Sequence, residues 1–357
     1  MRGAVLYGIN QQIEVRDDLA ADQPQPGEVR LRMRATGVCH SDLSGLNGTA
    51  PIGLPCVMGH EGAGEVVEVG DGVTDISVGD HAIIAWTPPC GTCRFCLGGQ
   101  PHLCLTVLFR TRPRFRCGDD AIEGFAGVGT FAEEVTLPQE AVVTIPEDVP
   151  FHAASLIGCA VMTGVGAAIN TAKVTPGASV LVLGCGGVGT SVIQGARIAG
   201  AAEIVAVDRV DAKLDLARGF GATHAVTPDQ LPEVMGSITG GDGFDFAFEA
   251  IGSATTMRSA FDMTRRGGCT CIVGAGRPDQ VVEFSAFELF FAEKRLTGSY
   301  YGSGNVRTDF HRLIRLWRTG RLDLDAMVTQ RIPIDDVNDA FTAMARGEGI
   351  RTLIEFD

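Results

Sequence analysis

The stretch SVLVLGCGGVGTSVIQGARIAG, residues 179–200, decides the fold of the middle of this chain. The apolar run at 179–183 has the composition of a buried β-strand, and residues 188–199 have helical composition and apolar spacing. Further short apolar runs alternate with helical segments from about residue 175 to about residue 300. Strands that alternate with helices predict a parallel, doubly wound sheet.

The turn between this strand and this helix reads Gly184-Cys185-Gly186-Gly187-Val188-Gly189. In such a Gly-x-Gly-x-x-Gly turn, Gly184 allows the tight bend, Gly186 lets the backbone approach a pyrophosphate, and Gly189 lets helix and strand pack closely. Gly187 and Val188 complete the loop, and the helix N-terminus would face the phosphates with free N–H groups. The loop therefore predicts a dinucleotide site.

The next β-run ends at Asp208, 24 residues after Gly184. A carboxylate there can accept both ribose hydroxyls of NAD and would repel the 2′-phosphate of NADP. Arg209, its neighbour, could tolerate that phosphate. Lys213 could reach the ribose, or it could be an ordinary surface lysine. These residues favour NAD as the cofactor.

The length of 357 residues is too great for one ordinary core and predicts two domains. Residues 1 to about 150 contain short strand-like runs, such as 29–33, 64–69 and 81–85, separated by Gly and Pro. We expect a catalytic domain over residues 1–160 and a cofactor domain over residues 161–299. We expect the tail, residues 300–357, to return to the first domain.

The composition restricts the partners and the compartment. A net charge of −14 argues against nucleic acid or an anionic membrane as a partner. No apolar run is expected to reach the roughly 20 residues that span a bilayer, and the N-terminus lacks a secretory signal pattern. Eleven cysteines without such a signal indicate a reducing compartment and metal ligation. The cytoplasm is the predicted location.

Cys90, Cys93, Cys96 and Cys104 form Cys-x2-Cys-x2-Cys-x7-Cys within a lobe at about residues 88–106. Four thiolates at this spacing suit a closed, tetrahedral structural zinc site. An iron–sulfur cluster is the competing use of such a run, and a disulfide pair or four unrelated thiols are further alternatives. Zinc is the predicted metal because it tolerates a cage made only of thiolates.

Separated motifs in a fixed order make the chain resemble the zinc-dependent medium-chain alcohol dehydrogenases over essentially its whole length. They are GVCHSD at 37–42, GHEGAG at 59–64, the four-cysteine lobe, GCAVMTG at 158–164, the glycine loop with Asp208, and GIRT at 349–352. The resemblance implies a GroES-like β-barrel catalytic domain, a Rossmann cofactor domain and an active site in the cleft between them.

The resemblance also implies a catalytic zinc bound by Cys39, His60 and Cys159, with an open fourth position for water or substrate. Taken singly, each of these residues is a weak indication, and their spacing alone does not bring them together. Glu61 matches a glutamate close to the zinc that can ligate it transiently. Asp42 matches the carboxylate that orients the histidine ligand.

Three further residues receive roles from the resemblance. Ser41 matches the hydroxyl that takes the proton of the alcohol, although it could be an ordinary turn serine. Arg351 matches a residue that contacts the cofactor pyrophosphate. Trp86 matches a position that lines the inner substrate pocket, where an indole would favour primary over secondary alcohols. The alternative for Trp86 is a plain core residue.

The chain departs from the best-known members of that family in three places. His40 stands where an arginine commonly holds the pyrophosphate, which should weaken NAD binding modestly or speed its release. Ser44 stands where many members have the histidine that ends the proton relay. The segment between Cys104 and Phe131 is shorter than in the longer members, which would reshape the outer substrate channel. It includes a basic run at residues 110–116, for which a solvated loop is the favoured interpretation.

The predicted function is reversible hydride transfer between a primary alcohol and NAD, with two zinc ions per chain. One alternative is a formaldehyde dehydrogenase that acts on the hydroxymethyl adduct of glutathione or mycothiol. Another is an enzyme that keeps NAD bound and passes electrons to another acceptor. A non-catalytic relative is the alternative from a different class. A homodimer or homotetramer is expected, and the apolar stretch at 281–291 is compatible with it.

Overall fold

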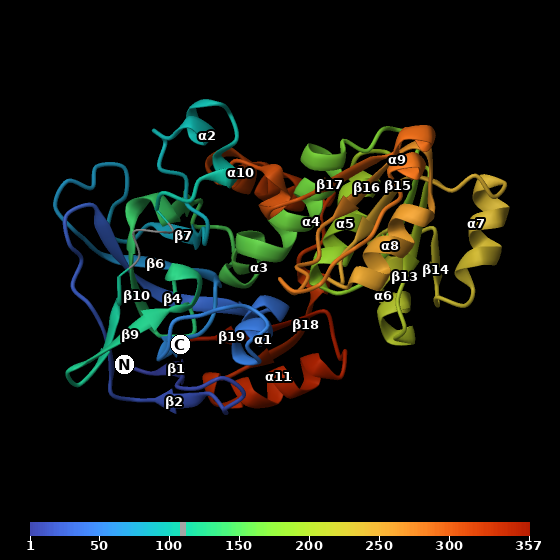
Figure 1. Ribbon diagram of the computed structural model, residues 1–357. Helices are drawn as coiled ribbons and strands as arrows, with labels where there is room; N and C mark the ends of the chain where they lie inside the picture. Colours follow the sequence, from blue (N-terminus) through green and yellow to red (C-terminus); the bar gives the residue numbers. More distant parts are fainter. Residues whose placement is uncertain (108–111) are drawn as a thin grey trace. The chain divides into compact units, whose positions relative to one another are not determined.

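A computed structural model of the chain describes residues 1–107 and 112–357 (Figure 1). These residues form two compact units. Unit 1 comprises Met1–Cys159, Asn305–Leu316 and Leu324–Asp357, and unit 2 comprises Ala160–Gly304 and Trp317–Asp323. The two units are described in turn.

Two β-sheets form most of unit 1. One sheet has the strand order β2-β1-β5-β9-β8-β3, and the other has the order β11-β7-β6-β4-β19-β18, with β10 also paired to β4. The strands of the first sheet are β1 (Gly3–Leu6), β2 (Glu14–Arg16), β3 (Leu19–Ala21), β5 (Cys56–Val57), β8 (Phe115–Cys117) and β9 (Asp120–Gly124). Those of the second are β4 (Glu28–Val38), β6 (Glu61–Val69), β7 (His81–Ile84), β10 (Glu134–Pro138), β11 (Val142–Ile145), β18 (Val328–Ile332) and β19 (Arg351–Glu355).

Strand β4 is the centre of unit 1, because it pairs with β6, β10 and β19. Its sequence alternates, so that Val29, Leu31 and Met33 are fully buried while the intervening arginines lie on the other face. Three arginines of this strand, Arg30, Arg32 and Arg34, pair with glutamates of the neighbouring strands β6 and β10. The β4–β19 pairing joins residues 351–355, near the C-terminus, to the N-terminal part of the chain.

The helices of unit 1 have fewer than ten residues, except α10 (Val306–Arg318), whose last two residues belong to unit 2. They are α1 (His40–Leu46), α2 (Arg94–Leu97), α3 (Phe151–Leu156), α10 (Val306–Arg318) and α11 (Val337–Ala345). Single turns are η1 (Pro101–Leu103), η3 (Phe125–Gly127), η4 (Gln139–Ala141), η8 (Asp325–Met327) and η9 (Ile334–Asp336). Helix α1 follows β4 after one residue, Cys39, which brings the carboxyl end of β4 into the site described below.

Unit 2 contains a parallel sheet with the strand order β14-β13-β12-β15-β16-β17. Its strands are β12 (Ser179–Leu183), β13 (Glu203–Val207), β14 (His224–Val226), β15 (Phe244–Glu249), β16 (Thr264–Ile272) and β17 (Arg295–Gly298). Its helices and turns are η5 (Ile157–Val161, shared with unit 1), α4 (Met162–Gly166), η6 (Ala167–Ala172), α5 (Gly187–Ile198), α6 (Asp211–Phe220), α7 (Leu231–Thr239), α8 (Ala254–Asp262), α9 (Ala286–Ala292) and η7 (Tyr301–Ser303).

The order of strands in unit 2 confirms the predicted doubly wound sheet. Strand β12 comes first in the sequence of this sheet but lies between β13 and β15, so the strand order reverses there. The strands β12, β13 and β15 are buried apolar runs, as expected for a parallel sheet covered on both faces. Ligands of such sheets bind outside the carboxyl ends of the strands at the reversal.

Among the described residues, one helical segment, Phe151–Ala172, is long and apolar enough by length and composition to cross a membrane. The expectation that no apolar run reaches such a length is therefore wrong. The segment joins α3, η5, α4 and η6 without a break, and 83% of its most apolar window is buried by other parts of the chain. A buried core helix has the same composition as a membrane span, and the burial accounts for its apolar character.

Candidate zinc and dinucleotide sites

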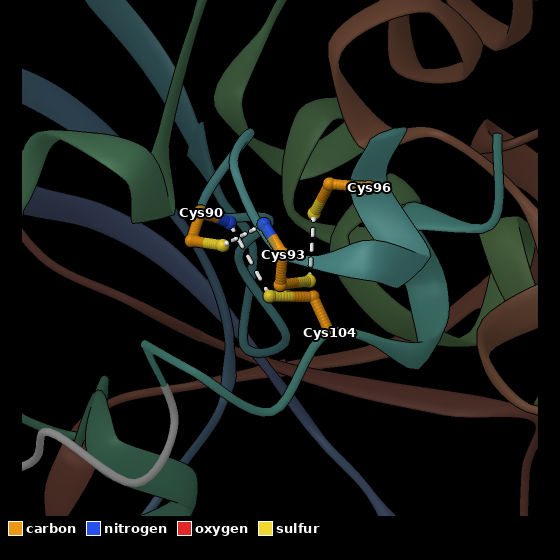
Figure 2. Close-up of side chains that lie close together, drawn as sticks. All are labelled: Cys90, Cys93, Cys96 and Cys104. Carbon is orange, nitrogen blue, oxygen red and sulfur yellow. Dashed lines mark hydrogen bonds between the residues drawn. The ribbon is translucent and has the colours of Figure 1, made fainter. Parts of the chain in front are cut away.

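The four cysteines of the lobe converge on one point in unit 1. The sulfur atoms of Cys90, Cys93, Cys96 and Cys104 all lie within 4.8 Å of one another, and Figure 2 shows their side chains directed toward a shared centre. All eleven cysteines of the chain are described, and all are free thiols, so the disulfide alternative is wrong.

The backbone of the lobe favours thiolates. The N–H groups of Cys93 and Thr92 donate to Cys90 Sγ at 3.3 and 3.5 Å, and the N–H of Cys90 donates to Cys104 Sγ at 3.3 Å. The groups that donate to Cys90 Sγ, those of Thr92 before that of Cys93, lower the pKa of Cys90 to about 5. Four converging sulfurs with donated N–H groups fit a tetrahedral zinc ion.

A second group of metal-ligand side chains, also in unit 1, is fully buried. Cys39 Sγ, Cys159 Sγ and ligand atoms of His60 and Glu61 all lie within 4.8 Å of one another. Cys39 joins β4 to α1, His60 directly precedes β6, and Cys159 lies in the π-helical turn η5 after α3. The fold thus brings together three residues that are far apart in the sequence.

Asp42 fixes the orientation of the His60 ring. Its Oδ1 lies 3.0 Å from His60 Nδ1, and its Oδ2 accepts the backbone N–H of Cys39 at 3.0 Å. His60 Nε2 then faces Cys159 Sγ at 3.3 Å. An imidazole held by a carboxylate at Nδ1 presents Nε2 to a metal, which is the arrangement predicted for Asp42.

The two thiols of this cluster are not equivalent. A hydrogen bond with Cys159, and the nearby positive charge of Arg351, hold the pKa of Cys39 well below its usual value against the effect of burial. The same contact with Cys39, together with burial, raises the pKa of Cys159. Two such thiols in contact need a cation between them if both are to ionise.

Glu61 and Arg351 complete the cluster. Glu61 is entirely buried, and in the part of the chain that the structure describes no group donates a hydrogen bond to either of its carboxylate oxygens. Burial raises the pKa of Glu61 to about 7, and the charge of Arg351 opposes that shift. Arg351 Nη2 lies 3.5 Å from Glu61 Oε1, and Arg351 Nη1 donates to Val38 O at 2.9 Å.

The donor set therefore fits a catalytic zinc ion bound by Cys39, His60 and Cys159. Two thiols and an imidazole are preferred zinc ligands, and Glu61, which Arg351 contacts at 3.5 Å, supplies a further carboxylate within reach. Buried acceptor atoms without a donor are costly, so a cation in their midst explains why they are retained.

Aromatic rings surround the ligand histidine. The indole of Trp86 packs edge-to-face on the His60 ring, with the ring centroids 6.1 Å apart. The centroid of the Phe125 ring lies 5.5 Å from that of His60. Trp86 is half-buried and packs against the apolar core of unit 1, as the alternative interpretation expects, while its place in a substrate pocket stays a prediction. Phe125 was not among the predicted residues, because one phenylalanine in a glycine-rich turn carries no distinctive sequence signal.

The remaining residues predicted from the GVCHSD motif lie on α1. His40 and Ser41 are exposed, and Ser41 Oγ lies 3.8 Å from Cys39 Sγ. Ser44 is half-buried one turn further along the helix. The contacts of Arg351 are within the buried cluster of unit 1, so its role at the pyrophosphate stays a prediction.

The interpretation of residues 110–116 as a solvated loop needs correction. Arg114 is 3% exposed and pairs with Glu28 at 2.7 Å, and Arg112 pairs with the same carboxylate at 2.8 Å. Asp22 pairs with Arg112 and Arg116, so carboxylates and arginines alternate along one network of ion pairs. The acidic partners lie some 90 residues away in the sequence, which is why the local pattern concealed them. Residues 110 and 111 lie outside the described residues.

The glycine loop of unit 2 has the geometry of a dinucleotide site. Gly184 has φ +95°, and α5 begins at Gly187. A β-carbon on Gly189 would lie 1.7 Å from Gly184 O, so the strand and the helix can approach only without one. A β-carbon on Gly186 would meet no atom of the described residues within 4 Å, so the space beside this glycine is open, as its predicted contact with a pyrophosphate requires.

Asp208 lies directly beside this loop. Its Oδ2 accepts the N–H of Cys185 at 2.8 Å, and its Oδ1 accepts that of Val210 at 3.1 Å. Arg209 is exposed and Lys213 is half-buried. Burial raises the pKa of Cys185 to about 12, and this thiol lies outside both groups of metal-ligand side chains found among the described residues.

Comparisons with known proteins agree with both sites. The family "Alcohol dehydrogenase GroES-like domain" matches residues 25–147, and "Zinc-binding dehydrogenase" matches residues 187–318. The S-(hydroxymethyl)glutathione dehydrogenase of Paracoccus denitrificans is 38% identical over 373 residues, which cover 99% of each chain. That of Synechocystis is 37% identical, with the same coverage.

The chain belongs to the zinc-dependent medium-chain alcohol dehydrogenases.

Solved structures of such dehydrogenases have the same fold. Benzyl alcohol dehydrogenase from Acinetobacter calcoaceticus superimposes with a TM-score of 0.93 at 31% identity, covering 100% of this chain and 99% of that one. The alcohol dehydrogenase TADH from Thermus sp. ATN1 superimposes with a TM-score of 0.86 at 25% identity, covering 100% of both chains. The predicted GroES-like and Rossmann fold is thereby confirmed, and so is the membership in an oxidoreductase family.

Metal analysis tests the two zinc sites of this dehydrogenase. We expect about two zinc ions per wild-type chain and about one in either Cys159→Ser or Cys96→Ser, because a structural site needs four ligands and a catalytic site three. Elemental analysis after dialysis gives the count. Cys56→Ser, at a buried thiol outside both clusters, is the control and should keep both ions. Iron in place of zinc would contradict the assignment.

The glycine loop makes a second prediction. Gly186→Ala should leave the melting temperature nearly unchanged, because its methyl group meets no atom of the chain. It should weaken NAD binding about ten-fold or more, because the methyl group occupies the space assigned to the pyrophosphate. Thermal unfolding and NAD titration measure the two effects. A variant that binds NAD normally would show that the cofactor lies elsewhere.

Proposed function

We propose that this dehydrogenase oxidises the hydroxymethyl group of a thiol–formaldehyde adduct with NAD, giving a thioester and NADH. The buried set Cys39, His60 and Cys159 in unit 1 is the observation that carries the reaction class. The identity of 37–38% to S-(hydroxymethyl)glutathione dehydrogenases, over 99% of the chain, supports the thiol adduct as the substrate.

The zinc ligands, Asp42 and Ser41 have separate roles in this reaction. Cys39, His60 and Cys159 would hold zinc, which when bound acts as a Lewis acid on the substrate hydroxyl. Asp42 keeps His60 Nε2 turned toward the ligand cluster. Ser41, on the exposed side of α1, would take the hydroxyl proton, since a serine hydroxyl both accepts and donates.

NAD would be held by unit 2, and it supplies the hydride acceptor. Gly186 leaves room for the pyrophosphate, and the N-terminus of α5 offers N–H groups to it. Asp208 stands where a ribose hydroxyl would donate and where a 2′-phosphate would be repelled. These features favour NAD over NADP.

A free aromatic primary alcohol is the second candidate substrate. The superposition on benzyl alcohol dehydrogenase and the rings of Trp86 and Phe125 beside His60 support it. Both candidates present a primary hydroxyl, and they differ in whether a thiol is required.

Absorbance of NADH distinguishes the candidates. We expect oxidation of formaldehyde with NAD to require added glutathione or mycothiol, and to exceed oxidation of benzyl alcohol by about ten-fold in kcat/KM. Thiol-independent oxidation of benzyl alcohol, without turnover of formaldehyde, would favour the second candidate. NADP is the cofactor control, and 1-propanol against 2-propanol tests the preference for primary alcohols.

Ser41→Ala tests the proposed proton acceptor in the same assays. It should lower kcat by about 10²-fold while the zinc content stays unchanged, because only the proton acceptor is removed. Absence of NADH in solution with every substrate would contradict the proposed function and would favour an enzyme that retains its cofactor.

The chain is also proposed to assemble with copies of itself through unit 2. Phe287, Phe290 and Phe291 of α9 are 67, 80 and 56% exposed, and Val281 is 77% exposed. Strand β17 next to them pairs only with β16 among the described strands. An apolar patch beside an open sheet edge is typical of a surface that another chain covers.

Light scattering tests this assembly. Phe290→Asp should convert a wild-type dimer or tetramer into a smaller species, because a charge in the apolar contact is costly to bury. Val78→Asp places the same charge on an exposed valine of unit 1 and should leave the assembly intact. A monomeric wild-type protein would contradict the proposal.

A further inference from the structure

Glu249 is a fully buried carboxylate in unit 2 that neither zinc site nor the glycine loop explains. It is the last residue of β15, the strand that pairs with β12 where the strand order reverses. The chain that follows it stays close to the glycine loop, since the N–H of Ala250 donates to Leu183 O at 2.9 Å. Glu249 therefore lies at the edge of the sheet where a dinucleotide binds.

One oxygen of this carboxylate organises the following turn. Glu249 Oε1 accepts the N–H groups of Ile251 at 3.0 Å, Gly252 at 2.8 Å and Ser253 at 3.5 Å, and the hydroxyl of Thr256 at 2.7 Å. Ser253 is the N-cap residue of α8, and its own side chain makes no capping bond. Glu249 thus caps the N-terminus of α8 from the preceding strand, and its hydrogen bonds hold residues 250–253 in one turn.

Residues 250–253, named here the ledge, contact the glycine loop directly. A β-carbon built on Gly184 would lie 2.7 Å from Ile251 Cγ1 and 3.3 Å from Ala250 O. The Ile251 side chain nevertheless remains 55% exposed. An aliphatic side chain left exposed against a nucleotide loop is suited to pack on the cofactor.

The second oxygen of the carboxylate is unsatisfied. Glu249 Oε2 is buried without a hydrogen-bond partner among the described residues, and a β-carbon on Gly274 would lie 2.8 Å from it. A buried acceptor without a donor destabilises the fold. The hydrogen bonds that this side chain does make are those of Oε1 to residues 251–253 and to Thr256, so it acts on that turn.

We propose that Glu249 is a positioning residue for NAD, which holds the ledge so that Ile251 forms a preformed apolar wall beside the pyrophosphate loop. The proposal rests on the NAD binding proposed above. A preformed wall removes the entropy cost of ordering residues 250–253 when the cofactor binds, so Glu249 acts on affinity and not on the hydride transfer itself.

Four variants test this role by NAD titration calorimetry, thermal unfolding and kinetics. Glu249→Leu removes every acceptor, and Glu249→Gln keeps an oxygen that can take the place of Oε1. Ile251→Ser removes the wall from an exposed position and should fold. Asp245→Asn is the matched control, because Asp245 lies in the same strand and binds Ser179 and Arg265 at the opposite end of it.

We expect Glu249→Leu to raise the Kd and KM for NAD about ten-fold or more, with kcat at saturating NAD within about three-fold of wild type. Ile251→Ser should raise the Kd about five-fold without a change in melting temperature. Glu249→Gln should restore most of the affinity, and Asp245→Asn should lose stability but not NAD affinity.

Several outcomes would overturn the proposal. One is a Glu249→Leu variant that binds NAD as tightly as Asp245→Asn, and another is normal affinity in Ile251→Ser, which decides the question if Glu249→Leu does not fold. Equal losses in Glu249→Gln and Glu249→Leu would assign the effect to charge and not to the ledge. A wild-type protein that binds no NAD would instead refute the proposed function.

Discussion

The structure of unit 1 depends on one electrostatic constraint, which is the burial of several metal-ligand groups in a small volume. Cys39, His60, Glu61 and Cys159 are almost completely excluded from water, and the nearest fixed positive charge is that of Arg351. Burial of unpaired ionised groups costs several kcal/mol for each group. Binding of a structural zinc ion contributes about 10 kcal/mol or more in small zinc domains, which is of the same order as that cost.

Unit 2 meets a different requirement, since its ligand is bound mainly by backbone groups. The strand and helix around the glycine loop come so close that only a glycine fits at residue 189, while the space at Gly186 stays open. A carboxylate oxygen of Asp208 and one of Glu249 accept hydrogen bonds from backbone N–H groups beside this loop. Hydrogen bonds within the chain thus hold this backbone in place without the cofactor, and such preorganisation reduces the entropy cost of binding.

The fold class was predictable from the sequence because its patterns are local. The alternation of β4 and the apolar run of β12 each follow from adjacent residues. The approach of Cys39, His60 and Cys159 was available only through the family resemblance, since no local pattern spans 120 residues. Contacts between distant polar groups escaped prediction altogether, as with Arg114 and Glu28, or with Phe125 beside His60. The helix over residues 151–172 was missed because polar residues interrupt its apolar sequence.

Anomalous diffraction at the zinc absorption edge tests the central claim most directly. The account predicts two peaks in each chain, one among the sulfurs of Cys90, Cys93, Cys96 and Cys104, and one bounded by Cys39 Sγ, His60 Nε2 and Cys159 Sγ. The second peak should have a coordination position that no residue of Cys or His occupies. A chain in which Cys39 or Cys159 points away from any metal, or in which the second peak is absent, would contradict it.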